Sequence, residues 1–342
     1  MNDIKGLLAS LLALNSVSGR EGIDKEGLLR LATPLFDEVY EDKLGSFAFI
    51  KRSGKENAPR LLIDAHFDKI GMMVSEICEG GFLAVCAIGG LDTRVLPATE
   101  VTVHAKRDIY GVLTSVPPHI SGEGSTPKMT DIYIDTGYTA EELKEIVSVG
   151  DIVTLKGDFE PLGESFVTSA GLDDKACLAA IFDMIGRTDA SSLCFDVYVT
   201  ASAQEETGKN GARLLAYDIK PDIAVITDVN FACGEDIDTS CSIEIDKGAC
   251  VDISALTDRR LTKSILRLCE QRKIPHSPIC EPTRTSTNND GVSVCGRGVK
   301  TALVGIPIKS MHTPSEVASI NDICALSRIL EAVACTKIED LI

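Results

Sequence analysis

Histidine and carboxylate side chains recur in this sequence at the points where predicted strands end. They are His66 and Asp68 in LLIDAHFD, Glu205 and Glu206 in VTASAQEET, Asp228 in DIAVITDV, and His312 in VGIPIKSMHT. Because ligands of open α/β sheets bind at the carboxyl ends of strands, we expect these side chains to gather at one edge of a sheet. Imidazoles and carboxylates without cysteine form a ligand set that suits Zn, Co or Mn. The sequence therefore indicates a metal site.

Each motif also has an interpretation that needs no metal. An isolated HxD pair is most often structural, and Asp173 and Asp174 in GLDDKACLAA are placed to cap the helical run that follows them. Asp228 is placed to cap the next turn, and Glu205 and Glu206 are compatible with a solvated turn. Two adjacent glutamates at the end of a buried strand are nevertheless costly unless a cation compensates their charge. The combination of motifs, rather than any one of them, favours the metal site.

Within the motifs, the spacing suggests separate roles. Because side chains alternate along a strand, we expect His66 and Asp68 on the same side, with Asp68 orienting the imidazole. One of the two adjacent glutamates would bind a metal, and the other would keep a raised pKa suited to a general base. The remaining histidines are interpreted as surface or packing residues: His104, His119 and His276.

The elements that must position these motifs alternate between strands and helices from residue 166 onward. We expect helices at 170–186, 210–219, 260–274 and 321–335, and strands at 194–204, 222–229 and 301–308. Two more helices, at 4–15 and 21–35, precede a buried strand at 61–68. This alternation predicts the α/β fold class, with a mostly parallel central sheet and flanking helices.

Residues 72–165 have a different pattern. Short β-rich runs are separated by Gly, Pro and Asp turns, and only residues 140–147 are typical of a helix. Such a stretch predicts a small β-barrel-like domain inserted into a larger one. The expected division is an α/β domain from residues 1–71 and 166–342, interrupted by a β-rich domain at 72–165.

Composition and charge exclude several kinds of partner. The net charge of −17 argues against nucleic acid and anionic membranes, and no segment approaches the ~20 apolar residues of a membrane span. GLLASLLAL resembles the core of an export signal, but Ser18 and Glu21 have the spacing of a capping box, which favours a mature first helix. The 12 cysteines include no CxxC pair, which indicates reduced thiols in a cytoplasmic protein.

Five stretches resemble the glutamyl and deblocking aminopeptidases, a family of dinuclear-zinc metallopeptidases that includes the tetrahedral TET particles. They are AHFDKIGMMV, GLDDKACLAA, QEETGKNGA, ITDV and MHTPSEV. They occur in the family's order, and the resemblance covers essentially the whole chain. It implies a zinc-aminopeptidase-like fold and removal of the N-terminal residue from short peptides. It also implies two divalent metal ions per subunit, zinc first with cobalt or manganese as alternatives.

The resemblance further implies a role for each site residue. The implied metal ligands are His66, Asp173, Glu206, Asp228 and His312. Asp173 would bridge two metals, one completed by His66 and Asp228 and the other by Glu206 and His312. Glu205 would be the general base and acid, and Asp68 would orient His66. The 72–165 insertion would mediate dimerisation, and the dimers would build a homo-oligomer of up to twelve subunits.

Some positions depart from the family's usual pattern: Lys69, Lys175, Asn289–Asp290–Gly291 and Lys309–Ser310. Because we expect these changes on the substrate side, the preferred N-terminal residue is left open. Three alternative functions also remain. They are a metal-dependent deacylase or carboxypeptidase of the same fold, a glycosidase with paired carboxylates, and an assembly protein that has lost catalysis.

Overall fold

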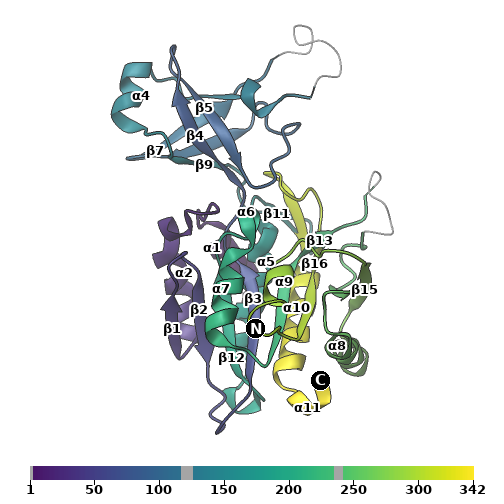
Figure 1. The fold of residues 1–342 in the computed structure, drawn as a ribbon. Helices are drawn as coiled ribbons and strands as arrows, with labels where there is room; N and C mark the ends of the chain where they lie inside the picture. The colour runs from purple at the N-terminus through teal and green to yellow at the C-terminus, as the bar shows by residue number, and fades with distance from the viewer. Residues whose placement is uncertain (1–2, 117–125, 235–241) are drawn as a thin grey trace.

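The computed structural model describes residues 3–116, 126–234 and 242–342 (Figure 1). The strands of its main sheet are β1 (Glu38–Glu41), β2 (Phe47–Lys51), β3 (Arg60–His66), β12 (Asp196–Ser202), β13 (Ile223–Phe231), β14 (Ala249–Ser254), β15 (His276–Glu281) and β16 (Thr301–Ile308). Their order is β1-β2-β12-β3-β13-β16-β14-β15. The central run β12-β3-β13-β16 and the β14–β15 pair are parallel, whereas β1–β2, β2–β12 and β14–β16 are antiparallel. The predicted mostly parallel α/β sheet is therefore confirmed.

Helices cover both faces of this sheet because successive side chains of a strand point to opposite faces. On one face, Leu61 and Ile63 pack in the large core formed with α1 (Ile4–Leu12), α2 (Lys25–Ala32), α5 (Leu172–Arg187), α8 (Arg259–Arg272) and α10 (Ile320–Ala334). On the other face, Leu62 joins a smaller core with α7 (Asn210–Ile219) and α9 (Asn289–Val292). The sequence run LLI is thus buried on both sides, as expected for a central parallel strand.

Helix α5 is buried along almost its whole length. Its residues from Leu172 to Ile185 are all buried, because the helix lies between the sheet and the outer helices α1 and α10. Apolar residues all around a helix are expected for a buried one. The first residues of α5 are therefore held firmly against the carboxyl ends of the central strands.

A second body, drawn at the top of Figure 1, is a closed antiparallel barrel. Its strands are β4 (Gly71–Ile77), β5 (Phe82–Ile88), β6 (Glu100–His104), β7 (Asp108–Leu113), β8 (Tyr133–Asp135) and β9 (Ile152–Leu155), with α4 (Ala140–Ile146) beside them. The barrel has its own apolar core, which includes Met72, Val101 and Ile134. The expected inserted β-barrel is confirmed as a fold feature, and its role in dimerisation stays a prediction.

A small antiparallel sheet follows the barrel in the chain. It consists of β10 (Glu160–Leu162), β11 (Phe166–Ser169) and β17 (Glu316–Ser319) in the order β10-β11-β17. Strand β17 also exchanges two backbone hydrogen bonds between Val317 and Lys309. The loop from Lys309 to Glu316, which carries His312, is thereby closed at its base.

Comparison with the sequence predictions shows where local patterns suffice. The helix at 210–219 and the strand at 301–308 have the predicted bounds, but strands β1, β2, β14 and β15 were not predicted. The predicted capping box is wrong: Ser18 Oγ lies 2.9 Å from Thr207 Oγ1, and Glu21 Oε1 accepts hydrogen bonds from the amides of Gly19 and Gln204.

The cysteines of the described residues are free thiols. None of the helices in this part of the chain is long and apolar enough to cross a membrane.

We expect Phe182→Ala to destabilise the protein by about 3–5 kcal/mol, because it leaves a cavity at the centre of the larger core. Phe182 on α5 is 1% exposed, and its ring meets those of Phe36 and Phe49 edge-on at 5.9 and 6.1 Å. Urea denaturation followed by circular dichroism measures the change. The control Tyr217→Ala removes a ring that is 61% exposed and should change stability by less than about 0.5 kcal/mol. Equal losses in the two variants would contradict the packing argument.

Candidate metal centre

The candidate ligands come from separate elements that meet at the carboxyl edge of the sheet. His66 is the last residue of β3, Asp228 lies in β13, and His312 follows β16. Asp173 lies in the first turn of α5, and the peptide bond that joins it to Asp174 is cis. Glu206 lies in the short helix α6 (Glu205–Gly208), directly after β12. All five are thus placed by the central parallel strands or by the helix packed against them.

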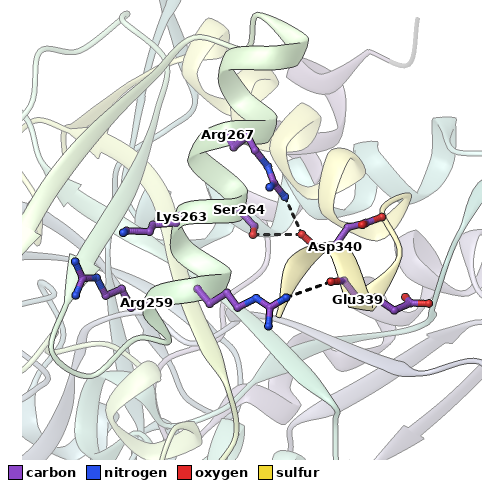
Figure 2. Close-up of a pocket in the computed structure, with 7 residues that line it drawn as sticks. Arg259, Lys263, Ser264, Arg267, Glu339 and Asp340 are labelled. Carbon is purple, nitrogen blue, oxygen red and sulfur yellow. Dashed lines mark hydrogen bonds between the residues drawn. The ribbon is translucent and has the colours of Figure 1, made fainter.

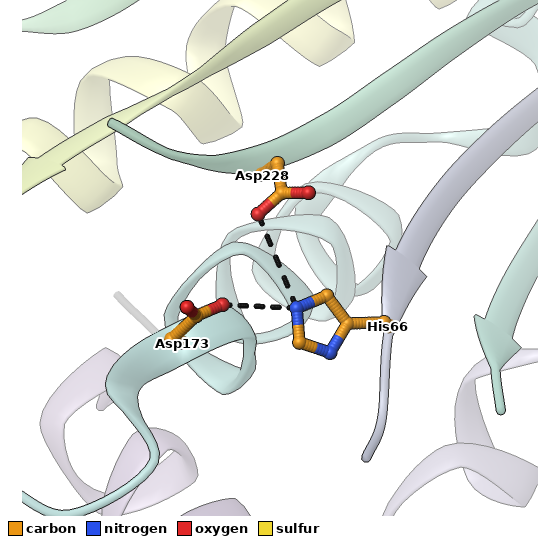
Figure 3. Close-up of side chains that lie close together, drawn as sticks. All are labelled: His66, Asp173 and Asp228. Carbon is orange, nitrogen blue, oxygen red and sulfur yellow. Dashed lines mark hydrogen bonds and ion pairs between the residues drawn. The ribbon is translucent and has the colours of Figure 1, made fainter. Parts of the chain in front are cut away.

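One group contains His66, Asp173 and Asp228 (Figure 3), whose ligand atoms all lie within 4.8 Å of one another. His66 Nε2 is 2.9 Å from Asp173 Oδ1 and 3.9 Å from Asp228 Oδ1. The other ring nitrogen, Nδ1, is 2.8 Å from the backbone oxygen of Asp68. A proton on Nδ1 that is donated to this carbonyl leaves Nε2 free as a ligand, which is the usual arrangement of a metal-binding histidine.

A second group contains Asp173, Glu206 and His312 and meets the same 4.8 Å limit. His312 Nε2 is 3.3 Å from Asp173 Oδ2 and 3.5 Å from Glu206 Oε2. Its Nδ1 is 2.9 Å from the backbone oxygen of Gly90, in the segment that follows β5. Asp173 therefore belongs to both groups, with one carboxylate oxygen in each.

The charges at this edge fit bound cations. Glu206 Oε1 is buried and has no hydrogen-bond partner among the described residues. Burial, and then the neighbouring Asp173 carboxylate, raise the pKa of Glu206 to about 8. Burial followed by the charge of Asp174 raises the pKa of Asp228 well above its usual range. Ionised carboxylates in such surroundings need compensating positive charge, so the donor set fits divalent metal ions.

Two further carboxylates hold the backbone of the site. Asp68 accepts hydrogen bonds from the amides of Glu205 and Glu206, at 3.0 and 3.1 Å. The nearest oxygen of its side chain is 3.7 Å from His66 Nδ1, and its backbone oxygen makes the closer contact at 2.8 Å, so the orienting role of the side chain stays a prediction. Glu316, which sequence reasoning missed, accepts from the amides of His312 at 2.8 Å and Asp173 at 3.3 Å.

Glu205 directly precedes the candidate ligand Glu206 in the chain and is 7% exposed. Burial raises the pKa of its carboxyl group, and the positive charge of Lys209 acts in the opposite direction. Lys209 Nζ is 3.1 Å from Glu205 Oε1, a charge contact whose geometry is not that of an aligned hydrogen bond. Sequence reasoning also missed Lys209, although its spacing of four residues from Glu205 is that of a helical ion pair.

The residues that depart from the resemblance lie in different surroundings. Lys175 is fully buried, its ammonium group donates to the backbone oxygen of Leu14, and it lies 5.4 Å from the centre of the Phe67 ring. The expectation that this change faces the substrate is therefore wrong. Lys69 is 7% exposed, and burial lowers its pKa to about 8. Asn289 is also buried, whereas Lys309 is exposed.

The other histidines of the described residues have local partners. His104 Nδ1 is 3.0 Å from Asp108 Oδ1, and His276 Nδ1 is 3.0 Å from the backbone oxygen of Ile274. Both agree with the expected surface and packing roles. His119 lies outside the described residues.

A large cavity of about 620 Å³ lies away from the metal groups, between α8 and α11 (Ile338–Leu341), and is shown in Figure 2. Arg267 and Ser264 donate to the backbone oxygen of Asp340, at 2.8 and 3.3 Å, and Arg260 donates to that of Glu339 at 3.4 Å. Since these bonds join the last helix to α8, we interpret this cationic lining as structural.

This chain is similar to aminopeptidases of known sequence and structure. The family model of the M42 glutamyl aminopeptidases matches residues 45–329. A lysyl aminopeptidase of Pyrococcus furiosus is 29% identical over 338 residues, covering 96% of this chain and 95% of its own. The solved aminopeptidase of Desulfurococcus kamchatkensis has a TM-score of 0.92 and 26% identity, covering 99% of this chain and 96% of its own. The Pyrococcus horikoshii TET1 peptidase, described as assembling into a tetrahedron or a large octahedral shell, has a TM-score of 0.85 and 27% identity, covering 97% of this chain and 99% of its own.

We expect metal binding to strengthen as the pH rises. The contact between His312 and Asp173 raises the pKa of His312 to about 9, and burial raises the pKa of Glu206 to about 8. Both groups are therefore protonated in the metal-free protein at neutral pH. A cation must displace these protons, so its apparent affinity should rise about tenfold or more per pH unit between about pH 6 and 8, and level off above about 9. Titration with Co²⁺ at several pH values measures this dependence. An affinity that does not change with pH would contradict the proposed competition.

Proposed function

The chain belongs to the M42 glutamyl aminopeptidase family, and we propose that it is a metal-dependent aminopeptidase that removes the N-terminal residue of short peptides. The single observation that carries the proposal is the position of Asp173. One of its oxygens faces His66 and the other faces His312, so that two groups of ligands share one carboxylate. Such sharing suits a pair of cations about 3.5–4 Å apart.

Under this proposal, His66, Asp173 and Asp228 hold one ion, and Asp173, Glu206 and His312 hold the other. The nitrogen and oxygen donors favour zinc, with cobalt and manganese as alternatives. When bound, two such cations supply a water of lowered pKa and polarise the scissile carbonyl. The acidic surroundings also attract the charged α-amine of a peptide, which accounts for cleavage at a chain end.

Glu205 is the proposed general base and acid. Its buried carboxylate takes a proton from the attacking water and passes it to the leaving amine, which requires a pKa nearer to neutral than that of an exposed glutamate. Burial provides this shift, and Lys209 limits it. Asp68 is the proposed positioning residue, because it fixes the amides of both Glu205 and Glu206.

We also propose that the chain forms a homo-oligomer. The TET1 relative assembles into closed shells, and the likeness to it extends over 97% of this chain, barrel included. The barrel exposes large apolar side chains at Phe82, Tyr110 and Tyr133, which suits a surface between subunits. Dimerisation through this barrel and a cytoplasmic location both stay predictions.

We expect removal of metal by EDTA to abolish hydrolysis of aminoacyl-anilides, and Zn²⁺, Co²⁺ or Mn²⁺, added separately, to restore it. Rates before and after reconstitution test this, together with a parallel series of acylated amino acids. Hydrolysis of the anilides that survives EDTA would contradict metal dependence, whereas hydrolysis of a glycoside substrate that survives EDTA would favour the glycosidase alternative. Turnover of acylated amino acids alone would favour the deacylase or carboxypeptidase, and full metal content without turnover would favour an inactive assembly protein.

We expect Glu205→Gln to retain its metal content and to lose about 10²–10⁴-fold in kcat, because the amide keeps the shape of the side chain but cannot carry the proton. His312→Ala should instead lose metal. Elemental analysis and steady-state rates separate the two effects, with exposed Glu79→Gln as the matched control. A Glu205→Gln variant that cleaves at the wild-type rate would remove Glu205 from the mechanism.

A further inference from the structure

A cationic hollow of about 390 Å³ opens beside α7, against the segment that leads into α9. Its volume lies in the range of about 300–1,000 Å³ typical of small-molecule sites. The charged residues that line it are Lys209, Arg213, Arg284 and Asp290. Three cations against one acid are an unusual local excess in a chain whose net charge is −17.

The hollow adjoins the proposed general base. Lys209, which lines it, has its Nζ atom 3.1 Å from Glu205 Oε1. Lys209 has a φ of +57° between α6 and α7, so the chain turns at this residue and brings the start of α7 next to Glu205. A peptide whose scissile bond lies at Glu205 therefore has the hollow within reach of one of its ends or side chains.

The positive charge of the hollow is offset only in part, because Lys209 is paired with Glu205 and one acid, Asp290, faces two arginines. Arg213 and Arg284 are exposed, and neither guanidinium group has an ion-pair partner among the described residues. The one lining acid, Asp290, has no ion pair with either arginine, and its Oδ1 accepts hydrogen bonds from the amide and the hydroxyl of Thr285, at 3.1 and 2.7 Å. The two arginines are thus available to an anionic group.

The segment from Arg284 to Gly291, which forms one wall of the hollow, is held in place by buried polar contacts of Asn288. Asn288 is 2% exposed, and its Nδ2 donates to Asp64 Oδ2 at 2.8 Å and contacts Ser202 Oγ at 2.9 Å. Asp64 itself is fully buried in β3, two residues before His66. The segment is therefore tied to the same strands that position the metal groups.

Close packing adds to this rigidity. A Cβ atom at Gly291 would lie 3.3 Å from the backbone oxygen of Lys209 and 3.4 Å from Arg213 Cβ, so glycine permits the close approach of the two walls. Because the walls are held before any ligand enters, little ordering is needed on binding.

We propose that this hollow is a subsite that binds a carboxylate group of the peptide substrate through Arg213 and Arg284, an inference that rests on the proposed aminopeptidase function. Guanidinium groups bind carboxylates by charge-assisted, often bidentate hydrogen bonds. The carboxylate has two sources, an acidic side chain of the first residue or the C-terminus of a dipeptide. Because Lys209 is paired with the proposed general base Glu205, only the two arginines are substituted in the test.

The test compares kcat/KM of the metal-loaded full chain on two matched pairs of substrates. One pair is glutamyl-anilide and leucyl-anilide, and the other is Leu-Ala and Leu-Ala-amide. We expect the wild type to favour the carboxylate-bearing member of at least one pair. In the double variant Arg213→Met, Arg284→Met that ratio should fall about tenfold, mainly through KM, as for the loss of about 1.4 kcal/mol. Arg297→Met, an exposed arginine outside the hollow, is the control and should leave the ratio unchanged.

The two substrate pairs identify the source of the carboxylate. A preference in the anilide pair assigns the hollow to an acidic first residue, and a preference in the dipeptide pair assigns it to the C-terminus. No preference in either pair, or a ratio that the double variant leaves unchanged, would overturn the proposal.

A binding measurement separates this proposal from the proposed function. Glutarate, a simple dicarboxylate, is titrated calorimetrically into the metal-loaded wild type and the double variant. Weaker binding to the double variant supports the subsite, even if the wild type hydrolyses no peptide. Equal binding to both proteins, or none to the wild type, overturns it, even if leucyl-anilide is turned over.

Discussion

The repulsion among carboxylates buried at one edge of the sheet is the constraint on which the rest of the structure depends. Asp173, Asp174 and Asp228 are all buried within this cluster, and Glu206 lies beside them. Unpaired charges are costly in such surroundings, and removing a partner from a buried charge is more costly still. The family relationship and the shared position of Asp173 both point to cations as the compensating partners.

Side chains can serve as ligands only if something else fixes the backbone that carries them. Asp68 and Glu316 do this with carboxylates that accept backbone amides from four site residues: Glu205, Glu206, Asp173 and His312. The barrel also contributes, because the carbonyl of Gly90 orients the His312 ring. A Cβ atom at Gly90 would lie only 3.0 Å from His312 Nδ1, so the approach depends on glycine. The inserted barrel thus contributes to the position of His312 in the candidate metal centre.

The sequence by itself determined the kinds of residues at the site and the local elements that carry them. The strand that ends in His66 and the helical period of residues 210–219 are local patterns that the folded chain keeps, whereas β13 continues three residues beyond Asp228. The order of the motifs was enough to indicate the family, which the match over residues 45–329 confirms.

Only the tertiary structure decided which atoms of these residues meet. The carboxylate of Asp68 turned to the amides of α6 rather than to His66, and Lys175 turned into the interior. Asn288 reaches Asp64 across 224 residues of chain, and Gly90 reaches His312 across 222. Local periodicity carries no information on such pairs, because it fixes the face on which a side chain lies and not the partner that packing brings to it.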